Sequence, residues 1–379
     1  PALKALNLLS FQRAIEESIL EHVDFILIAG DLFDTALPNI DLIKEVTKMF
    51  KKVHNASIPI YIIPGSHDYS YSGKTMLDVL EHAGLVINVM KFNEGKLQFV
   101  VDPKTGVKLC GMYGKKGGLE VYDYQKLEKY PLEQEGGTKI FLFHTGLAEF
   151  KPADMDMIDM ASVETLPKQF SYYAGGHIHY RYDTIYSTGP LVFPGPTFPN
   201  NFKELEDLEY GSYLIVEDFK LKKKILPLKD VVKITLDVNG LTPAGASEKI
   251  QQALPKDIQD RIVLLRIFGE LILGSPSEII YPDLKEAYIF LRNTSKLRSK
   301  LLEEVRSEDL QENIEAIETA VIQHHKGDLT LVDEEHFAHH LMRVFNSEKK
   351  EGEKVVDFEK RILGELLTFF KHEDPKNNP

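Results

Sequence analysis

Aspartate and histidine residues gather in four short segments of the sequence, and each segment directly follows an apolar stretch. The segments are residues 30–34, 65–68, 143–146 and 175–179. Carboxylate and imidazole groups together suit divalent manganese, iron or zinc. A zinc site built from thiolates is excluded, because Cys110 is the only cysteine, and its apolar neighbours predict a small buried side chain. The segments therefore predict a metal site with oxygen and nitrogen ligands.

The residue types and their spacing also suit the binding of two metal ions. A carboxylate such as Asp31 can bridge two cations roughly 3.5–4 Å apart, a spacing that clamps both oxygens of an in-line displacement at phosphorus. His177 and His179 alternate along an extended segment, so they face the same way and could address neighbouring cations. The pattern predicts a two-metal phosphoesterase.

These side chains can meet only if the elements that precede them bring them together. Up to about residue 220, apolar β-rich runs alternate with helical patterns, and the first runs are nearly continuously hydrophobic. This alternation predicts an α/β layered sandwich that binds its ligand beyond the carboxyl ends of the strands. The predicted strands are residues 24–30, 58–64, 107–112, 139–144, 172–176, 189–193 and 212–216, and the predicted helices are residues 9–22, 41–54 and 74–82.

Changes of pattern along the chain predict three parts. Residues 1–225 form the predicted catalytic domain, residues 231–292 a small α/β domain, and residues 293–379 a helical tail. Within the tail, residues 333–371 contain two stretches with apolar residues three and four apart, as in amphipathic helices. These helices could pack on the body of the protein or bind a partner. The candidate contact residues are Phe337, Leu341, Phe345, Phe358, Ile362, Leu366 and Phe370.

The overall composition is that of a soluble globular protein. Of the 379 residues, 43% are hydrophobic and 27% charged, and no apolar run is long enough to cross a membrane. The start of the chain lacks the features of a secretory signal, so a cytoplasmic protein is expected. A net charge of −13 argues against generic nucleic-acid affinity over the whole surface. It does not exclude a nuclease, because bound cations can attract phosphate locally.

The four segments resemble motifs two to five of the calcineurin-like metallophosphoesterases. Residues 30–34, with Pro38 close behind, are similar to the nuclease branch of that family, the SbcD and meiotic-recombination-eleven type of repair nuclease. The resemblance covers the layout of the whole chain and is specific in its first 200 residues. It implies a catalytic domain, a small capping domain and a tail that binds an SbcC-type ATPase.

The resemblance also implies a role for each metal ligand. Asp31 bridges the two metals, His179 binds the first, and His144 and His177 bind the second.

Three further residues gain roles from the resemblance. His67 contacts the scissile phosphate and helps the leaving oxygen depart, and Asp68 steadies His67 or shapes its loop. Asp34 stands where some relatives carry a second catalytic histidine.

The sequence departs from the family pattern in two places. The first family motif, Asp-x-His, is absent, so we expect the natural protein to extend upstream of Pro1. Ser66 stands where the family usually has an asparagine ligand of the second metal. A serine hydroxyl is shorter and a weaker donor, which predicts weaker occupancy of the second metal.

The expected function is that of a manganese-dependent nuclease in a double-strand-break repair complex of the SbcC–SbcD type. The resemblance implies 3′-to-5′ exonuclease and endonuclease action on DNA ends, and a homodimer with residues 41–54 among its contacts. Magnesium, iron or zinc could replace manganese. Two alternatives remain: a phosphatase or cyclic-nucleotide phosphodiesterase of the same superfamily, and a non-catalytic scaffold with an eroded site.

Four polar residues near the segments are weaker candidates for DNA contacts. Lys115 and Lys116 follow a predicted strand and could touch a phosphate backbone, although a solvated turn explains them equally well. Tyr180 and Arg181 lie just past His179 and could line the site.

Overall fold

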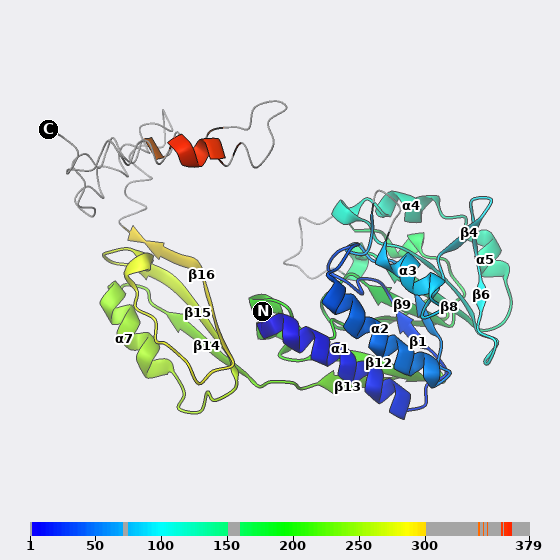
Figure 1. Ribbon diagram of the computed structural model, residues 1–379, viewed down its shortest axis with the longest axis horizontal. Coiled ribbons are helices and arrows are strands. Elements are labelled where there is room, and N and C mark those ends of the chain that lie inside the picture. The colour runs from blue at the N-terminus through cyan, green and yellow to red at the C-terminus, as the bar shows by residue number, and fades with distance from the viewer. Residues whose placement is uncertain are drawn as a thin grey trace. The chain divides into compact units, whose positions relative to one another are not determined.

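The chain folds into two compact units (Figure 1). The computed structural model describes residues 2–70, 75–150 and 160–300, together with residues 340, 341, 344, 347, 358 and 360–365. The first unit comprises residues 1–233, 257–264 and 284–291, and the second comprises residues 234–256, 265–283 and 292–379.

Two sheets form the framework of the first unit. Three parallel strands have the order β1-β2-β3, and six strands have the order β10-β11-β9-β8-β7-β6. In the larger sheet β7, β8, β9 and β11 are parallel, while β6 and β10 pair antiparallel at its edges. The strands are β1 (Ile26–Ile28), β2 (Ile60–Ile62), β3 (Ile87–Asn88), β6 (Val100–Val101), β7 (Lys108–Met112), β8 (Lys139–His144), β9 (Tyr172–Gly176), β10 (Tyr182–Tyr186) and β11 (Gly189–Phe193).

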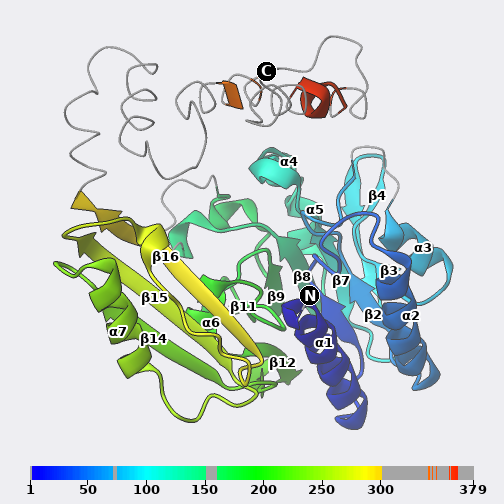
Figure 2. The ribbon, with the colours of Figure 1, turned by 60° about the vertical axis from the view of Figure 1, so that its left-hand side comes forward.

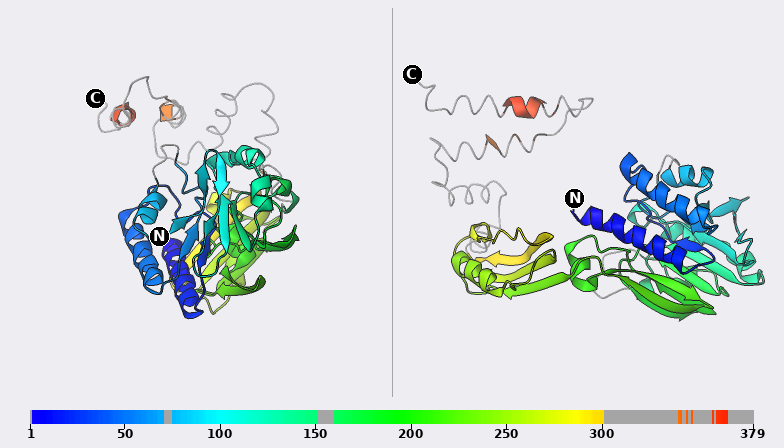
Figure 3. Two further views of the ribbon diagram at one scale, coloured as in Figure 1. Left: turned by 90° about the vertical axis from the view of Figure 1, so that its right-hand side faces the viewer. Right: turned by 60° about the horizontal axis from the view of Figure 1, so that its bottom comes forward.

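Helices cover the outer face of the smaller sheet. Helices α1 (Ala2–Leu20) and α2 (Ile40–Asn55) lie side by side there (Figures 2 and 3). Ile15 of α1 and Phe50 of α2 are buried together with Ile60 of β2. The burial of these apolar faces stabilises the helices on the sheet.

The two sheets pack against each other through a shared apolar cluster. Tyr61 of β2 and Ile63, which directly follows β2, lie in one cluster with Leu109 and Leu142 from the larger sheet. A further cluster, which includes Phe141 and the fully buried Cys110, covers the opposite face of the larger sheet. Every residue of β8 is therefore buried. This layered arrangement confirms the predicted α/β sandwich and the predicted burial of Cys110.

The local sequence explains where the predicted elements begin and end. Helix α2 begins after Asn39, whose Oδ1 accepts a hydrogen bond of 2.8 Å from the backbone N–H of Leu42. Helix α3 (Met76–His82) begins after Thr75 in a capping box. Strand β1 is shorter than predicted, because the chain already turns at Gly30, which has a φ of 89°.

Several short or polar elements of the first unit were not predicted. The hairpin of β4 (Lys91–Asn93) and β5 (Lys96–Gln98) is mostly exposed and lacks an apolar run. Strand β12 (Gly211–Glu217) was predicted, but its partner β13 (Lys220–Leu226) has a charged sequence, KLKKKIL, that hides its strand character. The small helices are α4 (Val121–Lys126), α5 (Tyr130–Gln134) and α6 (Phe202–Leu208).

A three-stranded sheet with one helix follows β13. Strands β14 (Val231–Asp237), β15 (Ile262–Leu271) and β16 (Ile289–Ser299) have the order β14-β15-β16. Helix α7 (Pro243–Ala253) begins at Thr242, whose side chain accepts a hydrogen bond from the N–H of Gly245. These elements lie in the stretch expected to form the small domain. The expected start of the helical tail, at residue 293, falls inside β16.

Most of the predicted tail lies outside the described residues. This applies to Phe337, Phe345, Leu366 and Phe370, while Leu341, Phe358 and Ile362 are described as helical positions. Among the described parts of the chain, no helix combines the length and apolar character required to cross a membrane.

Candidate metal centre

The metal centre lies where strands of both sheets end. Asp31 follows β1, His144 is the last residue of β8, and His177 follows β9. Asp31 and His177 have positive φ angles of 53° and 78°, which are strained for residues with a side chain. Such strain concentrates at functional sites, where the surrounding structure holds it in place.

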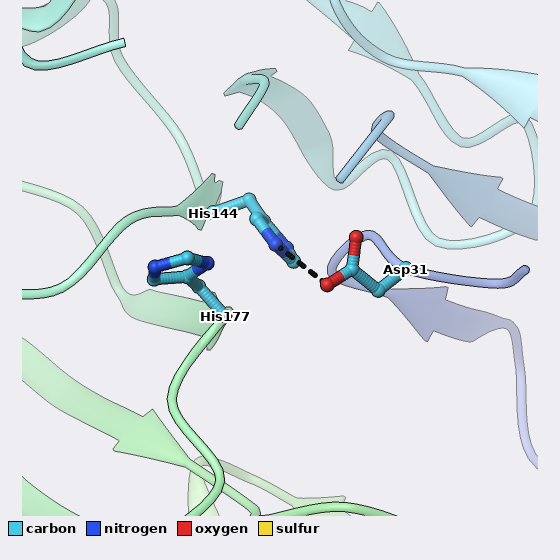
Figure 4. Close-up of side chains that lie close together, drawn as sticks. All are labelled: Asp31, His144 and His177. Atoms are coloured by element: carbon cyan, nitrogen blue, oxygen red, sulfur yellow. Dashed lines mark ion pairs between the residues drawn. The ribbon is translucent and has the colours of Figure 1, made fainter. Parts of the chain in front are cut away.

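The three side chains converge on one point (Figure 4). Asp31, His144 and His177 each offer one ligand atom, and these atoms lie within 4.8 Å of one another. Nε2 of His144 lies 3.2 Å from Oδ2 of Asp31. The rings of His144 and His177 have centroids 5.2 Å apart. Residues from three distant parts of the chain thus form a compact set of ligands.

The hydrogen bonding of His144 shows that this set fits a cation. Nδ1 of His144 lies 2.6 Å from the carbonyl oxygen of Ala29, and a carbonyl only accepts, so Nδ1 carries the hydrogen. In the neutral ring, Nε2 then presents a lone pair. Nε2 is buried without a hydrogen-bond partner, although it faces the Asp31 carboxylate. Two electron-rich atoms that face each other at this distance can both serve as ligands of one cation.

The electrostatics of the centre keep its ligands in their metal-binding forms. Burial opposes ionisation of Asp31, but a protonated His144 and the backbone N–H of His67 outweigh it and lower the pKa of Asp31 to about 2, and a bound cation would supply the same positive charge beside a neutral His144. Burial, reinforced by His144, lowers the pKa of His177 to about 4. At neutral pH, Asp31 is therefore an anion and His177 a neutral imidazole.

Two glycines allow the ring of His144 to approach the backbone. A Cβ at Gly176 would lie 1.9 Å from the carbonyl oxygen of Ala29, and a Cβ at Gly30 would lie 2.3 Å from Nδ1 of His144. Any side chain at either position would displace the ring or the carbonyl that orients it.

Asp68 holds two loops of the centre together. Its buried carboxylate accepts hydrogen bonds from the backbone N–H groups of Leu32, Phe33 and Gly65, at 3.2, 3.1 and 3.0 Å. Burial raises its pKa. These contacts join the loop of Asp31 to the loop after β2.

His67 and Ser66 lie beside Asp31 without joining the ligand set. The backbone N–H of His67 donates to Oδ1 of Asp31 at 2.8 Å, and Nδ1 of its exposed ring lies 3.1 Å from the backbone carbonyl of Asp34. The carboxylate of Asp34 is thus not the group that contacts His67. Oγ of Ser66 lies 3.5 Å from Oδ2 of Asp31.

His179 is held by a glutamate that sequence reasoning missed. It lies outside the ligand set described above, and its Nδ1 lies 2.8 Å from Oε1 of Glu204 in α6. Asn201 caps this helix through the N–H of Glu204 at 2.9 Å. An Asn-x-x-Glu pattern is visible in the sequence, but it indicates a helix start rather than a functional site.

The weaker candidates for DNA contacts are mostly engaged elsewhere. Nζ of Lys115 lies 2.6 Å from Asp123, and Oη of Tyr180 donates to the carbonyl of Phe150 at 2.7 Å. Nε of Arg181 donates to Oγ of Ser212 at 2.7 Å. Lys116 is exposed.

The comparison with protein families identifies the domain that carries this centre. The family described as calcineurin-like phosphoesterase matches residues 5–181, which include every ligand of the set. Residues 5–181 are a calcineurin-like phosphoesterase domain.

Similar curated proteins extend the likeness of the phosphoesterase domain. The DNA double-strand break repair protein Mre11 of Methanocaldococcus jannaschii is 27% identical over 244 residues, which is 63% of each chain. Mre11 of Archaeoglobus fulgidus is 24% identical over 82% of this chain and 70% of its own. Mre11 of Saccharolobus solfataricus is 27% identical over 71% of this chain and 65% of its own. The chain thus spans less than two thirds of the length of two of these three relatives.

Proposed function

We propose that this protein is a metal-dependent nuclease of DNA repair. The observation that carries the proposal is the buried Nε2 of His144, which faces the Asp31 carboxylate within a calcineurin-like phosphoesterase domain. The likeness to Mre11 proteins supports a DNA substrate over a small phosphate ester.

The proposed metal-binding roles are supported by the set of converging ligand atoms. Asp31, His144 and His177 would hold the cations, Asp31 as the ligand that both share, and His179 would add a ligand to the first metal. Manganese is the proposed cation, since carboxylate and imidazole ligands suit it. Bound divalent cations supply Lewis acidity toward the phosphoryl oxygens and activate water for in-line attack.

His67 is the proposed general acid. The Asp34 carbonyl fixes Nδ1, so Nε2 of the exposed ring is the atom that meets the substrate. We assign to the imidazolium form of His67, which carries a proton on both nitrogens, the transfer of the Nε2 proton to the departing 3′ oxygen, which leaves a neutral ring. Oγ of Ser66 is the proposed neutral ligand of the second metal.

The remaining parts of the chain have proposed roles in assembly. Residues 1–225 act as the nuclease domain, the unit from residue 231 to the end of β16 as a cap that contacts DNA, and the residues after β16 as the tail. Within the tail, residues 333–371 bind an SbcC-type ATPase, and α2 contributes to a homodimer.

Incubation of the full-length protein with labelled duplex DNA and Mn²⁺ tests the function. We expect shortened strands that are absent with EDTA or with Asp31→Asn. Parallel assays with a phosphomonoester and a cyclic nucleotide separate the related reactions. Hydrolysis of only those small substrates would replace the nuclease proposal, and no hydrolysis of any substrate would favour a scaffold.

A further inference from the structure

Two tyrosine rings stack beside the metal centre. The ring centroids of Tyr69 and Tyr113 lie 6.0 Å apart, and the ring planes differ by only 5°. Tyr69 lies two residues beyond His67, and Tyr113 directly follows β7. Both residues are partly exposed.

The backbone of this pair is fixed against the metal centre. The N–H of Gly114 donates to the carbonyl of Pro64 at 3.1 Å, which joins the segment of Tyr113 to the loop of Tyr69. A Cβ at Gly114 would lie 2.3 Å from Cδ2 of His144. The backbone next to Tyr113 therefore touches the ring of a metal ligand, and the pair is positioned before any substrate arrives.

Lys115 completes the cluster without leaving a free positive charge. Its Nζ lies 5.8 Å and 5.1 Å from the ring centroids of Tyr69 and Tyr113. The same nitrogen lies 2.6 Å from Oδ2 of Asp123, which also accepts a 2.9 Å hydrogen bond from Oη of Tyr113. This carboxylate compensates the ammonium charge, so the cluster is a poor phosphate clamp and presents aromatic surface instead.

Neither ring belongs to the hydrophobic core of the described residues. Tyr61, Tyr124 and Tyr173 are fully buried members of the hydrophobic clusters, whereas Tyr69 and Tyr113 belong to none of the clusters formed by the described residues. A stacked pair outside the core, beside a phosphoesterase centre, has the properties of a binding surface.

We propose that the Tyr69–Tyr113 pair binds a nucleobase of the DNA strand whose phosphate lies at the metal centre. This inference rests on the proposed nuclease function and adds the means by which the strand is held. Every base has an aromatic face, so stacking on tyrosine holds a strand without selecting its sequence. The metal centre binds phosphate, and the tyrosine pair binds the neighbouring base.

Binding of a single-stranded oligonucleotide with 2-aminopurine near its 3′ end tests the proposal. The full-length protein is used with Mn²⁺ and the oligonucleotide carries phosphorothioate linkages, which resist cleavage, so that binding is measured with the metals in place. The chain contains no tryptophan, so the emission of the probe is read against a low background. Stacking on a tyrosine quenches the probe.

The variants test whether binding depends on the aromatic rings of Tyr69 and Tyr113. Tyr69→Ala and Tyr113→Ala are expected to weaken binding about tenfold and to abolish the quenching. Phenylalanine at either position retains the ring and is expected to keep the affinity within about twofold. Tyr130→Ala removes a tyrosine of α5 that is 71% exposed and is expected to change neither quantity.

An abasic oligonucleotide tests the same proposal with the wild-type protein, so the result does not depend on whether the variants fold. The wild-type protein should bind it as weakly as Tyr69→Ala binds the intact strand. Equal affinity for abasic and intact strands, or unchanged quenching in both alanine variants, overturns the proposal. If the wild type cleaves DNA while these results appear, only the tyrosine assignment fails; if it never cleaves DNA, the nuclease proposal fails.

Discussion

Nδ1 of His179 lies 2.8 Å from Oε1 of Glu204. The carboxylate of Glu204 also accepts hydrogen bonds from the N–H of Asn200 at 2.8 Å and from the amide of Asn201 at 2.5 Å, so it is fixed in place. The hydrogen bond that Nδ1 of His179 donates to Glu204 raises the pKa of His179. A carboxylate that accepts a hydrogen bond from one nitrogen of an imidazole ring leaves the other ring nitrogen to bind a metal. Glu204 is thus the proposed positioning residue for His179.

Removal of the Glu204 carboxylate should weaken metal binding. We expect Glu204→Ala to lower Mn²⁺ affinity by about 10–100-fold, measured by calorimetry, because the His179 ring loses its orientation. The pKa of His179, followed by NMR, should fall in the same variant. Asp207→Ala removes an exposed carboxylate from the same helix and serves as the matched control. Equal Mn²⁺ affinities in the two variants would show that Glu204 does not position His179 for metal binding.

Replacement of Ser66 should strengthen the second metal site. The serine hydroxyl lies 3.5 Å from Oδ2 of Asp31, and an asparagine amide reaches further and is a better oxygen donor. We expect Ser66→Asn to increase the affinity for the second Mn²⁺, with the first unchanged. The measurement is a metal titration of both proteins, and Ser66→Ala as control should bind no more tightly than wild type. Unchanged affinity in Ser66→Asn would contradict the ligand role.

Loss of the His67 ring should lower the rate of DNA cleavage but leave metal binding intact. His67→Ala retains the backbone N–H that donates to Asp31, so Mn²⁺ affinity should stay within about twofold. Cleavage of DNA should fall by about 10²–10⁴-fold, the usual contribution of a general acid. Calorimetry and a cleavage assay on the same preparation give both values, and full activity in the variant would refute the assignment.

Replacement of Asp68 should destabilise the domain. Asp68→Ala leaves the buried N–H groups of Leu32, Phe33 and Gly65 without their acceptor. We expect the free energy of unfolding to fall by about 2–4 kcal/mol, measured by denaturant titration. The exposed Asp34, replaced by alanine, is the control and should change stability by less than about 0.5 kcal/mol. A stable Asp68→Ala protein would show that the loops are held by other contacts.

The sequence predicted the elements and residues that follow strong local patterns. The apolar runs before Asp31, His144 and His177 identified strands, and the carboxyl ends of these strands do meet. Strand β13 escaped prediction because its lysines mask its alternation.

Long-range pairs could not be predicted in the same way. Glu204 contacts His179 across 25 positions, and the only local sign of its place is a helix cap. Tyr69 and Tyr113 come from different sheets, and their stacking depends on how the two loops approach each other. Such contacts are products of tertiary packing, which no short sequence window contains.

The complete burial of Cys110 makes the protein a convenient host for chemical labelling. The thiol lies in the apolar layer behind β7, and burial raises its pKa well above the usual value, so it resists alkylation in the folded state. A cysteine introduced at an exposed position such as Tyr130 would be the reactive thiol among the described residues. A spin label or fluorophore placed there would report on encounters with DNA without first replacing the natural cysteine.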